Sequence, residues 1–145
     1  MAEVNIYLTF ENQCEAAFNF YKDAFGKEFA HIAKFGDMPP QEGQPPIPES
    51  ELNKVMHVSL PISKETVIMG SDVPSNQNYP IIQGNNYSIS INTYSTEEAD
   101  NLFAKLSADG KIIMAMDKTF WGAYFGMFTD KFGINWMINY DEPRG

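Results

Sequence analysis

The stretch VNIYLTFENQCEAAFNFYKDAFG, residues 4–26, decides the fold, because YSISINTYSTEEADNLFAKLSADG at 87–110 repeats its pattern. Each stretch begins with alternating apolar and polar residues, the period of a half-buried strand. Each continues with apolar residues at the i, i+3, i+4 and i+7 positions of an amphipathic helix. The matching helical residues lie 82 positions apart: Ala17 and Ala99, Phe20 and Leu102, Tyr21 and Phe103, Ala24 and Leu106. The sequence therefore predicts an internal duplication.

Both predicted helices have recognisable ends. Asn12 and Ser95 each precede a glutamate by three residues, which is the spacing of a capping box at a helix start. Gly26 and Gly110 follow the last apolar residues of the two patterns, where glycine commonly ends a helix.

Three short strand candidates follow each helix, at 27–35, 55–62 and 66–71 in the first half and at 111–116, 121–129 and 134–140 in the second. We therefore expect one domain over 1–145, made of a βαβββ module at 1–72, a linker at 73–86 and a second βαβββ module at 87–145. Residues 37–54 hold five of the nine prolines. Proline lacks a backbone donor and restricts its predecessor, so this segment is expected to be a long surface loop.

The charge balance limits the classes of partner. The chain has 19 acidic and 10 basic residues, a net charge of −9, and Arg144 is its only arginine. No basic stripe is available for nucleic acid, and a neutral or cationic ligand suits the charge better than an anion. Cys14 is the only cysteine, which excludes an internal disulfide. The sequence shows neither a signal-peptide pattern nor an apolar run of membrane-spanning length, so we expect a cytoplasmic protein that does not enter membranes.

Several strings then carry a family resemblance: YLTF at 7–10, AFNFYKDAFG at 17–26, FGDMP at 35–39, MHVSL at 56–60, MGSD at 69–72 and TFWGAYFGMFTDKFGINWMIN at 119–139. With them the chain resembles the vicinal oxygen chelate superfamily of glyoxalase I, bleomycin-resistance proteins and extradiol dioxygenases, and its PhnB-like branch in particular. The resemblance implies an α+β fold in which two tandem βαβββ modules form a curved mixed sheet around a cleft. It also implies a homodimer, which in some members exchanges modules.

The resemblance further implies where a divalent metal would be held, on the first and last strand of each module. The matching positions are Asn5, Met69 or Ser71, Asn86 and Met137. Hard cations prefer carboxylates, and zinc and iron sites of this class use imidazole and carboxylate. These residues are poor ligands, so no standard divalent metal is expected and the cofactor stays undefined.

His57 is the best candidate for a catalytic base or ligand, because it alternates with Val55 and Ser59 on the more polar face of its strand. It enters the cleft if that face is the concave one; otherwise it is a histidine bonded at the sheet surface, and the sequence leaves both open. His31 is expected to be structural or exposed. Asp72 is expected to bond local amides in a turn before a proline, and Glu11 to be a charge at a helix start.

The candidate ligand-binding residues are Tyr7, His57, Trp121, Phe125 and Met137. Trp121 and Phe125 are expected to share a strand face with Ala123 and Met127, while Gly122 and Gly126 on the other face permit close approach. Asp130 is expected to open the turn that ends at Gly133.

Two functions follow from these residues. One is a non-catalytic protein that binds a small apolar or cationic aromatic molecule in a metal-poor cleft. The other is a metal-dependent lyase, isomerase or dioxygenase-like enzyme that acts on an α-oxo or vicinal-dioxygen substrate with His57 as base or ligand. No glycine-rich nucleotide-binding loop supports a methyltransferase, and Cys14 has no evident histidine partner for nucleophilic catalysis. Whether the protein is an enzyme stays open.

Overall fold

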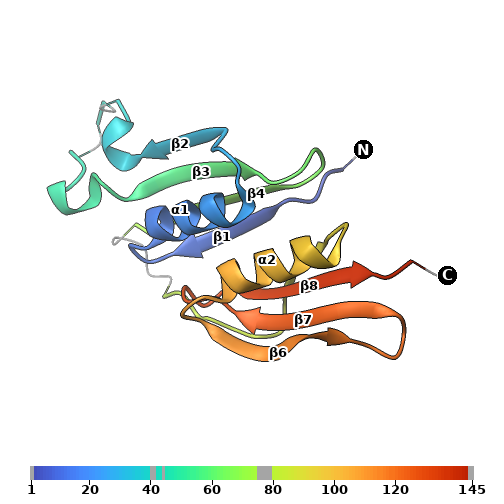
Figure 1. Ribbon diagram of the computed structural model, residues 1–145. Helices are drawn as coiled ribbons and strands as arrows, with labels where there is room; N and C mark the ends of the chain where they lie inside the picture. The colour runs from blue at the N-terminus through green and yellow to red at the C-terminus, as the bar shows by residue number, and fades with distance from the viewer. Residues whose placement is uncertain (1, 40–41, 44, 75–79, 144–145) are drawn as a thin grey trace. The chain divides into compact units, whose positions relative to one another are not determined.

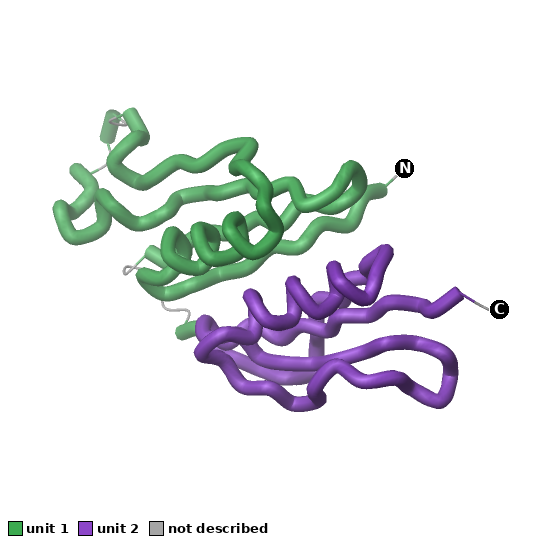
Figure 2. The backbone as a smooth tube through the Cα atoms, viewed as in Figure 1, with its two compact units in different colours: residues 1–81 green, residues 82–145 purple. Residues whose placement is uncertain are grey.

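The computed structural model describes residues 2–39, 42–43, 45–74 and 80–143. The chain forms two compact units, residues 1–81 and 82–145 (Figure 2). The boundary between them falls inside the predicted linker at 73–86. No helix in the described ranges is long and apolar enough to cross a membrane.

Unit 1 holds the strands β1 (Ile6–Phe10), β2 (His31–Lys34), β3 (Val55–Pro61) and β4 (Val67–Asp72), with the helix α1 (Cys14–Phe25) between β1 and β2 (Figure 1). The sheet order is β1-β4-β3-β2, and β1 runs parallel to β4 while the other pairs are antiparallel. Two short 3-10 turns, Phe35–Asp37 and Glu49–Glu51, lie between β2 and β3.

Unit 2 repeats this arrangement with β5 (Ile89–Asn92), α2 (Thr96–Ser107), β6 (Lys111–Lys118), β7 (Ala123–Thr129) and β8 (Asn135–Asp141). Its sheet order is β5-β8-β7-β6, with β5 parallel to β8. The two tandem βαβββ modules predicted from the repeat are therefore confirmed.

Each helix covers one face of its own sheet (Figure 1). In unit 1, Phe18 and Tyr21 of α1 are fully buried, and the Phe18 ring meets Phe10 of β1 edge-on at 6.2 Å. In unit 2, Phe103 of α2 meets Phe128 of β7 edge-on at 5.1 Å. Burying one such side chain contributes about 1.5–3 kcal/mol, so these contacts fix which face of each sheet is internal.

The two helices start in different ways. Ser95 caps α2 as predicted, and its hydroxyl accepts the Glu98 N–H at 3.0 Å. The prediction for Asn12 was wrong: it has a left-handed φ of 65°, and Gln13 stands at the N-cap without a side-chain bond. Asp72 satisfies the start of α1 instead.

The helix ends also differ. Gly26 ends α1 in the left-handed conformation, as expected. Gly110 does not end α2, which stops at Ser107: the C-cap residue Ala108 leaves the helical conformation with a ψ of 128°, and Asp109 follows with a left-handed φ of 60°. A side chain on Gly110 would collide with the Thr129 carbonyl, so this glycine is required for close packing rather than for a helix cap.

Three predicted strands have limits that differ by two or more residues from those in the structure. The strand predicted at 27–35 begins only at His31, and the one predicted at 111–116 continues to Lys118. The strand predicted at 121–129 begins at Ala123, because Gly122 has a φ of 87° and belongs to the preceding turn.

The expectation that Asp72 bonds local amides was wrong, because its partners are distant in the chain. It is buried, its Oδ1 accepts the Cys14 N–H at 3.0 Å, and its Oδ2 accepts the Val55 N–H at 2.9 Å. One carboxylate thus joins the end of β4 to the start of α1 and the start of β3. Each partner is a backbone group that would otherwise be buried without a bond.

Asp72→Asn should lower the free energy of unfolding by about 1–3 kcal/mol, because an amide has one acceptor oxygen and leaves one buried N–H unsatisfied. Urea unfolding measures this loss. Asp37→Asn is the matched control, since Asp37 is exposed and accepts the nearby Lys34 N–H at 2.8 Å. Equal effects of the two substitutions would contradict this role for Asp72.

Candidate functional site

The four-stranded sheet of unit 1 has one face that α1 leaves uncovered. This face carries a row of side chains that crosses the strands. In the ladder Tyr7 pairs with Met69, Met69 with Ser59, and Ser59 with His31. Tyr7 and His31 are exposed, while Met69 and Ser59 are half-buried. Paired residues point to the same side of a sheet, so the row crosses the whole uncovered face.

His57 lies on this uncovered face, where its alternation with Ser59 placed it. It is half-buried and stands opposite Ala33 of β2. Its ring centroid is 5.9 Å from that of Tyr7 and 6.0 Å from that of His31. The structure therefore brings together His57 and Tyr7, two of the predicted site residues, and adds His31, which the sequence left as structural or exposed.

The uncovered face of unit 2 is different in chemistry. Phe125 pairs with Asn139, Met127 with Met137, and Met137 with Ser90. Phe125, Met127 and Met137 are all half-buried, which leaves an aromatic ring and two thioethers partly open to solvent. Tyr124 points to the opposite, helix-covered face, because its hydroxyl donates to the Asp100 carboxylate of α2 at 2.6 Å. That bond raises the pKa of Tyr124.

Trp121 lies in the turn between β6 and β7, not on the strand face predicted for it. Its side chain is 58% exposed, and its ring centroid lies 6.4 Å from that of Phe125. The neighbouring Phe120 is 97% exposed and packs edge-on against Trp121 at 5.0 Å. Trp121 is therefore close enough to Phe125 to extend the apolar face, although Trp121 lies in the turn and not on the strand.

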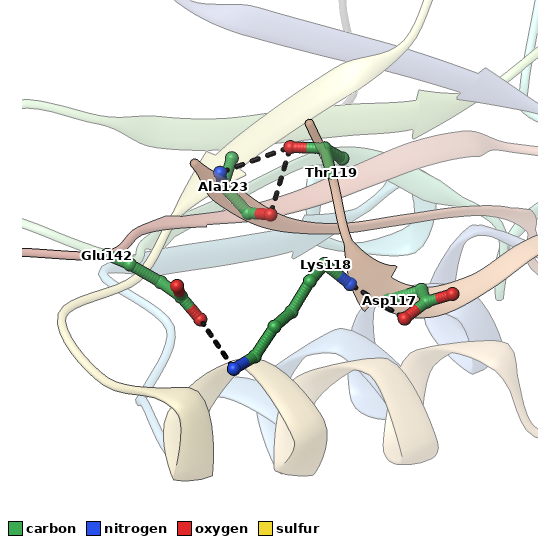
Figure 3. Close-up of polar contacts among 5 residues, drawn as sticks. All are labelled: Asp117, Lys118, Thr119, Ala123 and Glu142. Carbon is green, nitrogen blue, oxygen red and sulfur yellow. Dashed lines mark hydrogen bonds and ion pairs between the residues drawn. The ribbon is translucent and has the colours of Figure 1, made fainter. Parts of the chain in front are cut away.

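Polar contacts hold this turn in shape (Figure 3). The Thr119 hydroxyl donates to the Ala123 carbonyl at 3.0 Å and accepts the Ala123 N–H at 3.1 Å. The Lys118 ammonium pairs with the Glu142 carboxylate at 3.7 Å, and the Glu142 N–H donates to the Gly122 carbonyl at 3.1 Å. The turn that carries Trp121 is thus closed by Thr119 and tied to Glu142, which directly follows β8.

Two carboxylates that were not predicted from the sequence border Phe125. Asp117 of β6 pairs with Phe125, and Asp141 of β8 pairs with Ala123. Asp141 also accepts the Asn139 side-chain N–H at 3.1 Å, which places it on the same face as Phe125. Lys118 pairs with Tyr124 and so belongs to the other face. The alternation of β6 could have placed Asp117 on this face, but two bulges shift the register of β6 against β7 by two residues in total.

Cys14 and Asp130 belong to the packing and hydrogen bonding of the fold. Cys14 is fully buried, and burial, together with the carboxylates of Asp72 and Glu15, raises the pKa of its thiol. It is therefore no nucleophile at neutral pH. Asp130 opens the predicted turn: it accepts the Phe132 N–H at 2.8 Å, and its other oxygen accepts the Trp136 indole N–H at 2.8 Å. Glu11 is exposed, just after β1.

The residues matched to the metal positions do not fit a divalent cation. Asn5 and Asn86 are exposed, and Met69, Ser71 and Met137 are half-buried on the uncovered faces. Amides, thioethers and one hydroxyl offer neither the imidazole nor the carboxylate that such a site requires. Among the residues with described placement, no group of three or more His, Cys, Asp or Glu side chains could hold an ion.

Comparisons with known proteins agree with the architecture. The family model of the glyoxalase/bleomycin resistance protein/dioxygenase superfamily matches residues 4–138. Protein YjdN of Escherichia coli K12 is 31% identical over 138 residues, which cover 92% of this chain and 91% of YjdN.

Two solved structures are similar over nearly their whole length. Protein PA1353 of Pseudomonas aeruginosa has a TM-score of 0.83 and 35% identity, covering 99% of this chain and 100% of its own. A Bacillus cereus PhnB protein, described as a putative 3-demethylubiquinone-9 3-methyltransferase, has a TM-score of 0.73 and 26% identity, covering 96% and 99%. The resemblance to the PhnB-like branch is confirmed, and the chain belongs to the glyoxalase/bleomycin resistance protein/dioxygenase superfamily.

Proposed function

We propose that this protein binds a flat aromatic small molecule, preferentially a cation, on the uncovered face of unit 2. The observation that carries the proposal is the partly open surface of Phe125, Met127 and Met137, bordered by Asp117 and Asp141. We call these five residues the aromatic–thioether surface. Trp121 extends it from the β6–β7 turn.

The chemistry of the surface favours a planar ligand. Aromatic rings stack on one another or meet edge-to-face, and methionine sulfur makes favourable contacts with ring edges. Both side-chain types adapt to a flat apolar molecule without leaving polar groups unpaired. Ser90, Asn92 and Asn139 lie on the neighbouring strands of the same face, where they can bond polar substituents of the ligand.

The charges favour a cation. Asp117 and Asp141 stand on either side of Phe125, while the nearest basic residue on β6, Lys118, is paired with Glu142. A cation over an aromatic ring gains about 0.5–2 kcal/mol from the ring itself. An anion would face two carboxylates and a chain with a net charge of −9.

N-methylquinolinium, quinoline and quinoline-2-carboxylate test this at pH 7.5, because they carry the same ring with positive, neutral and negative charge. Calorimetry should rank their affinities in that order. Trp121→Ala should weaken N-methylquinolinium by about two- to thirtyfold, the equivalent of one aromatic contact. Tyr94→Ala is the control, since Tyr94 is 92% exposed and lies between β5 and α2, outside the β6–β7 turn. Tighter binding of the carboxylate, or equal loss in both variants, would contradict the proposal.

The double variant Asp117→Asn and Asp141→Asn should weaken N-methylquinolinium by about two- to tenfold at low salt, because each exposed carboxylate contributes modestly. Quinoline should bind unchanged, and the difference should shrink in 0.5 M NaCl as the charges are screened. Asn keeps the acceptor with which Asp117 Oδ1 bonds the Lys118 N–H at 2.8 Å. A loss of quinoline affinity of the same size would refute an electrostatic role.

A second candidate is a metal-dependent lyase, isomerase or dioxygenase-like enzyme acting on an α-oxo or vicinal-dioxygen substrate. The observation that favours it is His57, half-buried on the uncovered face of unit 1 beside Tyr7, where it can exchange a proton with a bound molecule. Turnover of the methylglyoxal–glutathione hemithioacetal or of catechol, lost in His57→Gln, would establish this activity. Equal rates in the variant would exclude His57 as the base.

We also propose that the protein forms a homodimer, as its family resemblance suggests. Light scattering should give twice the 16.4 kDa chain mass. A monomer at micromolar concentration would contradict this.

A further inference from the structure

We infer that His31 and His57 form a two-imidazole site for a divalent ion of the nickel, copper and zinc class on the uncovered face of unit 1. The inference goes beyond the proposed aromatic–thioether surface, which lies in unit 2. It also differs from the metal positions implied by the family resemblance, since neither histidine occupies one of them.

The sheet brings the two side chains together through its register. His31 pairs with Ser59, and His57 pairs with Ala33, so the two histidines are diagonal neighbours on antiparallel strands. Residues two apart on a strand share a face, which directs both imidazoles to the uncovered side. Diagonal neighbours are within reach of each other when their side chains are long or aromatic.

The ring separation matches a shared ion. Metal–nitrogen bonds of about 2.0–2.1 Å place each imidazole centroid roughly 3.2 Å from the ion, so two rings on one ion lie at most about 6.4 Å apart. The His31 and His57 centroids are 6.0 Å apart, inside that limit. Both strands are already in place, so only side-chain rotation is needed for the two rings to converge.

The surroundings suit an ion with free coordination positions. His31 is exposed and His57 half-buried, so water reaches both rings. The basic residue of β2, Lys34, is ion-paired with Glu15 at 3.0 Å. Residues 1–72 carry eleven acidic and five basic side chains, and this excess of negative charge favours a cation.

The ligand type selects the class of metal. Imidazole suits nickel, copper and zinc, whereas magnesium and calcium require oxygen ligands. Two protein nitrogens leave positions for water or for a substrate oxygen, which distinguishes this site from a closed structural one. Copper(II) is the most informative probe, because it stands highest in the affinity order of these ions.

Copper(II) chloride titrated into the purified chain should bind one ion per protomer and show nitrogen hyperfine coupling from two imidazoles in electron paramagnetic resonance. His31 and His57 are the only histidines in the sequence, so no other imidazoles of the chain can give this signal. Copper(II) should also displace zinc that has been bound to the same site beforehand. Coordination by oxygen alone, or by a single imidazole, would overturn the inference.

His31→Gln should weaken copper binding at least tenfold and reduce the coupling to one nitrogen, because it removes one ligand from an exposed edge-strand position. Ser59→Ala is the control, since Ser59 stands opposite His31 and two residues from His57 on the same face but supplies no imidazole. In wild-type protein the two histidine ring signals in the proton NMR spectrum should broaden together at substoichiometric copper, a readout that needs no variant. Unchanged affinity in His31→Gln, or broadening of one ring only, would refute the shared site.

Discussion

The structure depends on one constraint: among its described residues each unit has a single α-helix for a four-stranded sheet, so only one sheet face can be buried within the unit. The helix decides which face that is. Phe18 of α1 packs against Phe10, and Phe103 of α2 packs against Phe128. These contacts turn the buried residues of β1, β3, β4, β7 and β8 inward. Because strand side chains alternate, the remaining residues are forced onto an uncovered face.

The duplication preserved this constraint but not the chemistry of the faces it leaves uncovered. In unit 1 the uncovered face holds Tyr7, His31 and His57. In unit 2 the corresponding face holds the aromatic–thioether surface, which includes two carboxylates. A protein built from two such modules can therefore present two different kinds of binding chemistry while both modules keep the same βαβββ core. The family's fold is thus compatible with residues other than metal ligands at the positions where the resemblance places a metal.

Much of the fold could be predicted from the sequence because its determinants are local. The periodicity of apolar residues predicted the strands and helices, and the three-residue spacing of Ser95 and Glu98 predicted the cap of α2. Contacts between distant segments could not be predicted: Asp72 bonds Cys14 and Val55, far from it in the chain. The same limit applies to the site, since the pairing of Asp117 with Phe125 depends on bulges in β6, and the approach of His31 to His57 depends on strand register. Trp121 was misplaced because Gly122 ends the strand pattern with a backbone conformation that period alone does not reveal.

The central claim is that the uncovered face of unit 2 is a binding surface, and methyl NMR on protein with labelled methionine methyls tests it most directly. Met127 and Met137 lie on that face, whereas Met116 packs beside Gly126 on the helix side and serves as an internal reference. Saturating N-methylquinolinium is predicted to shift the Met127 and Met137 signals and leave that of Met116 in place. Shifts confined to Met116, or no shifts at a concentration where calorimetry detects binding, would contradict the account.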